Sequence, residues 1–129
     1  MRFLLDTHTF IWFVIDNPKL SHRLKKLIED DQNEKLLSIA IIWEMGIKHS
    51  TGKLSFNLPF EIFILWQISI NDFEILDIQL RHSFVVATLP FHHRDPFDRI
   101  LIAQAMVEEI PILSADSAFD AYSNDYGKI

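Results

Sequence analysis

The sequence contains no cysteine among its 129 residues. Disulfide bonds and thiolate metal sites are therefore excluded, and we expect the chain to act in a reducing cytoplasm. Long uninterrupted apolar runs are also missing, because Asp6 follows the apolar residues 3–5, and residues 58–70 include Glu61 and Gln67. Neither stretch has the form of an export signal or the length of a membrane-spanning helix. We therefore expect no association with a membrane.

Basic residues are scarce. Twelve Lys and Arg stand against 18 Asp and Glu, which gives a formal net charge of −6 at pH 7. This balance argues against bulk electrostatic attraction to a polyanion, because nucleic-acid-binding proteins usually carry a basic surface. It still allows a nucleic-acid substrate whose phosphates meet bound metal ions and a few local arginines.

Apolar residues, in contrast, are abundant. They make up 49% of the chain and include 11 Phe and three Trp. So many apolar side chains in a short chain indicate that part of the apolar surface is covered by a partner or by a second copy. No repeat or linker divides the sequence, and we expect residues 1–129 to form one domain.

Short apolar strands and helices alternate along the chain. We expect strands at residues 2–5, 35–39, 73–78 and 112–114, and helices at residues 9–15, 23–29, 40–49, 59–70, 79–88 and from 96 to just before Pro111. Ser21 is expected to cap the helix at residues 23–29. A short helical turn is expected to follow from residue 117. The alternation predicts an α/β fold with a mainly parallel sheet and helices on both faces. Ligands bind outside the carboxyl ends of the strands in such sheets, and Asp6 and Asp116 each directly follow a predicted strand end or lie close to it.

The helix that begins near residue 96 is expected to lie at the centre of the domain. Asp95 is a suitable N-cap, Pro96 is tolerated at the first helical position, and Asp98 falls at the third. Residues 100–107 are apolar apart from Gln104, and a helix that is apolar on nearly every face is buried. Its N-terminus combines two carboxylates with two arginines, which favours a functional site over a purely structural element.

Each acidic residue also has a structural interpretation. Asp6 and Asp116 can cap the helices that follow them, and Glu44 can pair with Lys48 on the same helix. As a set, however, the acids lie close to apolar segments, where carboxylates are rarely left unpaired. Apolar residues flank Glu44 at positions 41–43, 45 and 47, which predicts that much of its helix is buried. Two carboxylates about 4 Å apart repel by roughly 4 kcal/mol at an effective dielectric constant near 20. Such a pair takes up a proton or a divalent cation, and oxygen ligands suit Mg²⁺ or Mn²⁺.

Four segments of the chain resemble PIN-domain proteins, most closely the VapC-like toxins of bacterial type II toxin–antitoxin pairs. The segments are LLDTHTFIW at residues 4–12, LLSIAIIWEMGIKHSTGKL at 36–54, LPFHHRDPFDRILIAQA at 89–105 and ILSADSAFDAY at 112–122. They occur in the family's order over almost the whole chain, and together they are specific.

The resemblance implies a PIN-like three-layer sandwich around a parallel sheet, usually dimeric. It also implies an Mg²⁺- or Mn²⁺-dependent endoribonuclease that cleaves RNA and is held inactive by a cognate antitoxin. Carried over by motif, the catalytic and metal-binding residues are Asp6, Glu44, Asp98 and Asp116.

The same motifs imply supporting residues around these acids. Asp95 matches the first acid of DPFDR and is expected to act as a cap beside the site, and Thr7 is expected to order water around the metal. The chain departs from the family at Ile41, where many relatives have a serine. This change is expected to weaken a supporting hydrogen bond without removing a ligand.

Substrate contacts are expected from the arginines of the third segment. Arg94 and Arg99 are positioned by sequence to contact flanking phosphates, and Lys48 and Lys53 are further candidates, for which a solvated surface role is an equal alternative. No pair of histidines has the spacing of a zinc site, so we expect the histidines at polar loop and cap positions.

Two other functions fit parts of the sequence. A phosphoacceptor domain of the response-regulator kind needs an acidic pair after the first strand and a lysine after the last one. Here Thr7 follows Asp6, and residues 114–119 contain no lysine. A catalytically silent PIN-like module that only binds an antitoxin or another protein is the stronger alternative, although such a module has no need to keep all four acids.

Overall fold

The computed structural model describes residues 1–92 and 94–115. The elements are, in chain order, β1 (Arg2–Leu5), α1 (Thr7–Val14), α2 (His22–Glu29), β2 (Glu34–Ser38), α3 (Ile39–Ser50), α4 (Phe60–Asn71), β3 (Glu74–Leu76), α5 (Leu80–Thr88), α6 (Pro96–Glu108) and β4 (Ile112–Leu113).

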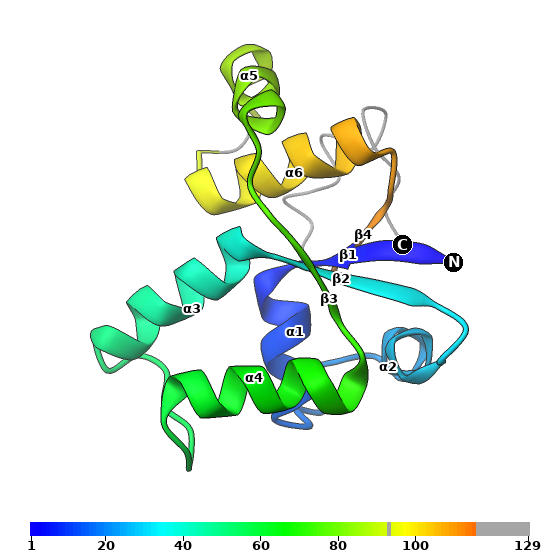
Figure 1. Ribbon diagram of the computed structural model, residues 1–129, viewed down its shortest axis with the longest axis vertical. Coiled ribbons are helices and arrows are strands. Elements are labelled where there is room, and N and C mark those ends of the chain that lie inside the picture. Colours follow the sequence, from blue (N-terminus) through cyan, green and yellow to red (C-terminus); the bar gives the residue numbers. More distant parts are fainter. Residues whose placement is uncertain (93, 116–129) are drawn as a thin grey trace.

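The strands form a parallel sheet in the order β3-β2-β1-β4. In the register of the sheet, Leu4 lies opposite Leu36 and Ile112, and Ser38 lies opposite Leu76. Helices α5 and α6 lie on one side of the sheet, and α1, α2 and α4 lie on the other, whereas α3 leads away from the carboxyl end of β2 (Figure 1). The predicted α/β sandwich with a parallel sheet and helices on both faces is confirmed.

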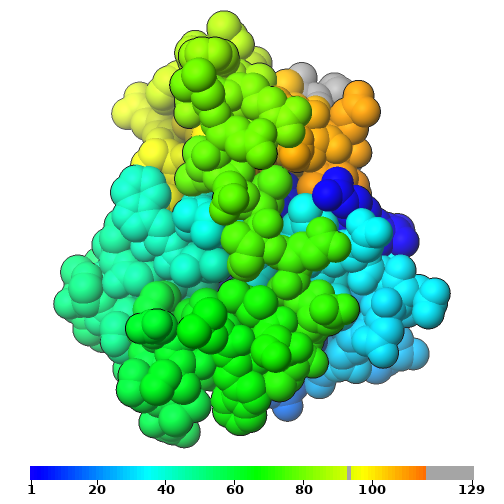
Figure 2. Space-filling view, viewed as in Figure 1, coloured from blue at the N-terminus to red at the C-terminus, as the bar shows by residue number. Residues whose placement is uncertain are grey.

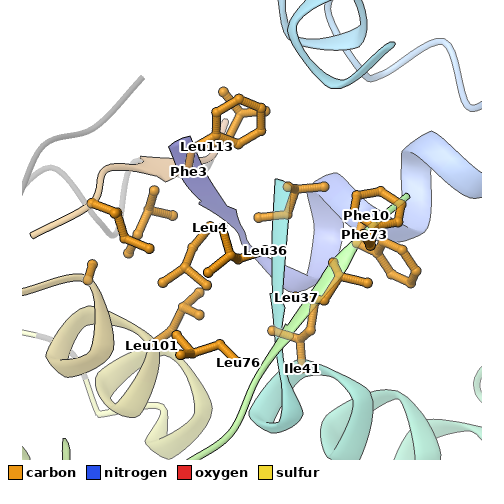
Figure 3. Close-up of a cluster of buried hydrophobic side chains, with 14 of the residues drawn as sticks. Phe3, Leu4, Phe10, Leu36, Leu37, Ile41, Phe73, Leu76, Leu101 and Leu113 are labelled. Atoms are coloured by element: carbon orange, nitrogen blue, oxygen red, sulfur yellow. The ribbon is translucent and has the colours of Figure 1, made fainter. Parts of the chain in front are cut away.

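Alternating strand residues supply the two halves of the core. Leu4 of β1 faces Leu101 of α6, whereas Leu37 of β2 lies beside Phe10 and Phe73 on the opposite face (Figure 3). The rings of Phe10 and Phe73 meet edge to face with centroids 5.5 Å apart, a favoured aromatic arrangement. Because successive side chains of a strand point to opposite faces, short strands of continuous apolar residues serve both layers at once.

Side-chain caps decide where several helices begin. The helix expected at residues 9–15 starts two residues earlier, at Thr7, because Asp6 Oδ1 accepts the Thr9 N–H at 2.8 Å. Ser21 caps α2, and Asp95 caps α6 by accepting the backbone N–H groups of residues 97 and 98. The predicted caps at Ser21 and Asp95 are confirmed. Strands β3 and β4 are shorter than expected; within the described residues, β3 pairs with β2 and β4 pairs with β1.

A large apolar surface stays uncovered on α4. Its buried residues are Ile64 and Gln67, whereas Ile62, Leu65 and Trp66 are all more than half exposed. Helix α4 forms much of the lower front surface in Figure 2. A groove of about 540 Å³ lies between α4, residues 55–58 and the end of α1. Part of the apolar surface expected from the composition is therefore exposed on α4.

None of the helices within residues 1–92 and 94–115 is both long enough and apolar enough to cross a membrane.

His82 is buried at the start of α5. Its Nδ1 accepts the backbone N–H of Gln79 at 2.9 Å, so a neutral ring carries its proton on Nε2. Within the described part of the chain Nε2 has no hydrogen-bond partner, and Glu108 Oε2 lies 3.9 Å away. Burial lowers the pKa of His82 below its ordinary value of 6.5; the Arg81 charge acts in the same direction and Glu108 acts against both. The expected cap role is confirmed, in a fully enclosed position.

This geometry predicts a loss of stability in mild acid. The pKa of His82 is lower in the folded state than in the unfolded state, so the unfolded state binds more protons once the pH falls below about 6.5. The free energy of unfolding therefore decreases as the pH falls, by at most about 1.4 kcal/mol per pH unit for one group. Urea unfolding between about pH 7.5 and 5 measures this slope. His82→Gln, which keeps an acceptor for the cap, is expected to flatten the curve, and an unchanged curve would contradict the assignment.

Candidate active site

Three of the predicted site acids lie on elements at the edge of the sheet where the strands end. Asp6 follows β1, Glu44 lies on the helix that follows β2, and Asp98 lies at the start of α6. The N-terminus of α6 lies close to the first part of α3 (Figure 1), and the rings of Trp43 and Phe97 meet edge to face with centroids 5.1 Å apart. The next residue after each of these rings is an acid. The fold thus brings Glu44 and Asp98 to neighbouring helices at one edge.

Asp6 is a buried residue, 3% exposed, and its carboxylate is held from two sides. Oδ1 accepts the Thr9 N–H at 2.8 Å, and Oδ2 accepts a short hydrogen bond from the Ser114 hydroxyl. Its place at the N-terminus of α1 also stabilises its negative charge. Ser114 was not expected from the sequence as part of the site, although its position at the end of β4 beside β1 is a signal that could have indicated it.

The Glu44 carboxylate is 13% exposed and is also held from two sides. Oε1 accepts a hydrogen bond from the Thr7 hydroxyl at 2.6 Å, and Oε2 lies 3.2 Å from the Lys48 ammonium group. The expected pair between Glu44 and Lys48 is confirmed. Because Thr7 is adjacent to Asp6 in the chain, this hydrogen bond joins the end of β1 to the middle of α3.

The expectation that the helix around Glu44 is largely buried is wrong for one of its faces. Ile39, Trp43 and Ile47 follow one another at intervals of four residues, and all three are exposed, Trp43 by 60%. Residues four apart lie on the same face of a helix. An apolar stripe therefore runs along α3 next to the carboxylate of Glu44.

Asp98 occupies the third position of α6, as expected, and is half-buried. Its backbone N–H donates to Asp95 Oδ1 at 3.0 Å. The position near the N-terminus of a thirteen-residue helix favours a negative charge there. Asp116 lies outside the described residues.

The donors at this edge suit a hard divalent cation in their chemistry. The acids offer carboxylate oxygens only, which is the donor type that Mg²⁺ and Mn²⁺ prefer. The buried hydroxyl of Thr9, whose N–H binds Asp6, has no hydrogen-bond partner in the part of the chain that the structure describes. Within residues 1–92 and 94–115, however, no three His, Cys, Asp or Glu side chains form a group that could hold a metal ion.

The structure assigns Arg99 a role other than the expected contact with phosphate. Arg99 is 7% exposed. Its guanidinium donates to the backbone carbonyls of Val86, Leu89 and Pro90 at 3.1–3.3 Å. The guanidinium also lies 4.2 Å from the centroid of the Phe91 ring. These contacts hold the loop before α6 and leave little of the group for a substrate. Arg94, in contrast, is exposed.

Comparisons with known proteins agree on the fold. The sequence profile of one protein family, described as PIN domain, matches residues 3–124. No curated protein matches the sequence.

Among solved structures, similar chains come from VapBC complexes of three bacteria. VapBC2 from Rickettsia felis, bound to a DNA fragment from its promoter, has a TM-score of 0.74 at 14% identity and covers 100% of this chain and 98% of its own. VapBC-1 from nontypeable Haemophilus influenzae has a TM-score of 0.66 at 16% identity, with coverages of 100% and 97%. VapBC-5 from Mycobacterium tuberculosis has 0.61 at 16%, with 99% and 95%. At these identities the likeness establishes the fold alone.

The contacts of Arg99 predict a structural effect of its replacement. Arg99→Lys keeps the charge but cannot reach several carbonyls in one plane, so we expect the free energy of unfolding to fall by about 2–3 kcal/mol, the scale of a few lost hydrogen bonds to a charged group. Urea unfolding measures the change. Arg94→Lys is the matched control at an exposed position and should leave stability unchanged. Equal effects of the two substitutions would contradict the structural role.

Proposed function

Because the chain belongs to the PIN-domain family over residues 3–124, we propose that it is a metal-dependent endoribonuclease that cleaves RNA phosphodiester bonds as the toxin of a toxin–antitoxin pair. PIN-domain proteins are typically nucleases and generally use divalent metal ions. The observation that carries the proposal is the hydrogen bond from the Thr7 hydroxyl to the partly buried carboxylate of Glu44, because Thr7 directly follows the buried Asp6 in the chain. Burying carboxylates lowers the stability of the folded state unless they are paired. Their placement near one another therefore favours a function over a purely structural role.

We assign Asp6, Glu44, Asp98 and Asp116 as the residues that hold Mg²⁺ or Mn²⁺. Such an ion, when bound, supplies the ability to make water a better nucleophile and to offset the negative charge that develops on the phosphate. The chain's own residues orient the ligands. Thr9 N–H and the Ser114 hydroxyl fix the plane of the Asp6 carboxylate, and the Thr7 hydroxyl fixes one oxygen of Glu44.

The remaining residues of the proposed site act on charge and substrate. Asp95 caps α6 and thereby presents Asp98 at the helix terminus. Arg94 is the exposed cation beside this terminus, and we assign it a contact with a flanking RNA phosphate. One bound divalent ion raises the formal net charge of −6 by two. The local change at the site removes part of the repulsion toward RNA.

We further propose a cognate antitoxin and a second copy of the chain as protein partners. The similar solved structures are all of VapBC proteins, and the one from Mycobacterium tuberculosis is described as a member of the VapBC family of toxin–antitoxin systems. The exposed stripe of α3 (Ile39, Trp43 and Ile47) adjoins Glu44, so an antitoxin segment that covers this stripe would also block the acids. The apolar surface of α4 is left for the second copy. An RNA substrate places the reaction in the cytoplasm.

The central test is cleavage of labelled single-stranded RNA. We expect cleavage in Mg²⁺ or Mn²⁺, none in EDTA, and a loss of about 100-fold or more for Asp98→Asn, because removal of a metal ligand removes most of the electrostatic stabilisation of the transition state. Urea unfolding shows whether the variant remains folded.

Two outcomes would contradict the proposal. Activity that survives both EDTA and Asp98→Asn would rule out the metal-dependent reaction. Metal binding without cleavage of any RNA would favour a PIN-like binding module, the alternative function.

Growth arrest on expression tests the toxin assignment. Arrest that disappears in Asp6→Ala, and that co-expression of the antitoxin suppresses, supports this assignment.

The pair between Glu44 and Lys48 predicts that the lysine weakens metal binding. Its ammonium group occupies Glu44 Oε2 at 3.2 Å and repels a divalent cation. Two unit charges about 4 Å apart repel by roughly 1 kcal/mol even with the screening of water, and a divalent ion is repelled more strongly. Lys48→Met is therefore expected to tighten Mn²⁺ binding by at least about fivefold. Calorimetric titration measures this affinity, and Lys53→Met is the control. An unchanged or weaker affinity in Lys48→Met would show that the lysine is not a competitor of the ion.

A further inference from the structure

Gln104 is the one polar residue in the otherwise apolar part of α6, residues 100–107, and the proposed reaction does not use it. Its side chain is fully buried. A buried amide group that lacks hydrogen bonds costs several kcal/mol, so its partners have to be built into the fold. Those partners lie on two other elements of the carboxyl edge of the sheet.

The amide oxygen of Gln104 accepts a hydrogen bond from the Ser38 hydroxyl at 2.5 Å. The same Ser38 oxygen accepts the backbone N–H of Ala40 at 3.0 Å and so caps α3. A hydroxyl has one proton to donate. The Ser38 hydroxyl donates its proton in the hydrogen bond to Gln104, and a lone pair on the same oxygen accepts the N–H of Ala40. The amide of Gln104 therefore determines how Ser38 caps the helix.

The amide nitrogen of Gln104 connects the same point to β3 and α5. It donates to the carbonyl of Asp77, just after β3, at 3.3 Å, and lies 3.4 Å from Nδ1 of His82. Ser38 and Leu76 are opposite each other in the ladder between β2 and β3. One side chain of α6 therefore binds the carboxyl ends of two neighbouring strands.

Ser38 and Gln104, which the hydrogen bond joins, lie on the same elements as two of the acids or directly before them. Glu44 lies six residues after Ser38 on α3, and Asp98 lies six residues before Gln104 on α6. The hydrogen bond between Ser38 and Gln104 and the ring contact between Trp43 and Phe97 are two separate contacts between the acid-bearing helices. Two separated contacts fix both the distance and the angle between two helices, whereas one contact permits rotation.

We infer that Gln104 is a positioning residue: by holding the Ser38 cap, it sets the start of α3 against α6 and thereby places Glu44 relative to Asp98. The inference rests on the proposed function only where it assigns these two acids to one metal site. It also explains why an amide, and not another leucine, occupies the middle of the most buried helix.

The test compares Gln104→Leu, which keeps the volume and removes the hydrogen bonds, with Leu101→Ala. Leu101 is a buried residue of the same helix outside the polar link, and its truncation costs about 2–5 kcal/mol of stability. In the full chain, Mn²⁺ affinity is measured by calorimetry under conditions where urea unfolding shows every variant to be folded. Gln104→Leu is expected to weaken Mn²⁺ binding about tenfold, the lower end of the range for lost supporting contacts of a metal ligand. Leu101→Ala is expected to leave the affinity unchanged despite its loss of stability.

Ser38 provides a second and independent readout. Ser38→Ala should weaken Mn²⁺ binding like Gln104→Leu, the double variant should be no weaker than the single variants, and Ser38→Thr should restore binding because it keeps the hydroxyl. Hydrogen exchange at the Ala40 amide should become faster in both Gln104→Leu and Ser38→Ala, whether or not metal is present.

These measurements separate failure of the inference from failure of the proposed function. If the wild-type chain binds Mn²⁺ and Gln104→Leu loses no more affinity than Leu101→Ala, the positioning role is overturned. If the wild-type chain binds no Mn²⁺, the proposed function fails, and exchange at Ala40 still decides whether Gln104 holds the cap. Unchanged exchange in Gln104→Leu would overturn that step as well.

Discussion

A negative charge that is removed from water must be held by donors, and this constraint organises the carboxyl edge of the sheet. Asp6 receives its donors from α1 and from Ser114 after β4, and Glu44 receives Thr7 from the chain after β1 and Lys48 from its own helix. Each hydrogen bond crosses from one element to another or fixes the start of a helix. The contacts that make the charges tolerable therefore also define the shape of the site.

The same polar groups serve the fold and the proposed chemistry. The Asp6 carboxylate ends β1, caps α1 and meets β4, so the position of a proposed metal ligand depends on the sheet itself. Two other buried polar side chains, Arg99 and Gln104, hold the loop before α6 and the start of α3. Helix α6 is thus held at two positions along its length, Arg99 and Gln104. This rigidity is what a site made of separate acids needs, because the ligands of a metal ion have to keep their geometry.

Apolar surface is arranged in a complementary way. The sheet and its helices bury one continuous core, whereas α3 and α4 keep Trp43, Trp66 and neighbouring aliphatic side chains in contact with water. Exposed apolar patches of this kind are characteristic of protein interfaces. The stripe on α3 lies beside Glu44, so a partner that binds there would also cover the acids of the proposed site. Under the proposed function, a partner bound to this stripe would control the activity through direct contact with the site.

The sequence alone determined the order of the elements, the parallel α/β architecture, the caps at Ser21 and Asp95, and the pair between Glu44 and Lys48. These features depend on local patterns: the period of apolar residues, the choice of cap, and spacing along one helix. Only the tertiary structure decided that Thr7 binds Glu44, that Ser114 binds Asp6, that Arg99 faces carbonyl groups and that Gln104 holds Ser38. Such contacts join residues far apart in the chain, and a side chain with several possible partners does not reveal its choice until the strands and helices have been packed. The exposure of one face of α3 could not be predicted for the same reason. An apolar helix has the same sequence pattern whether it packs against the core or against a partner.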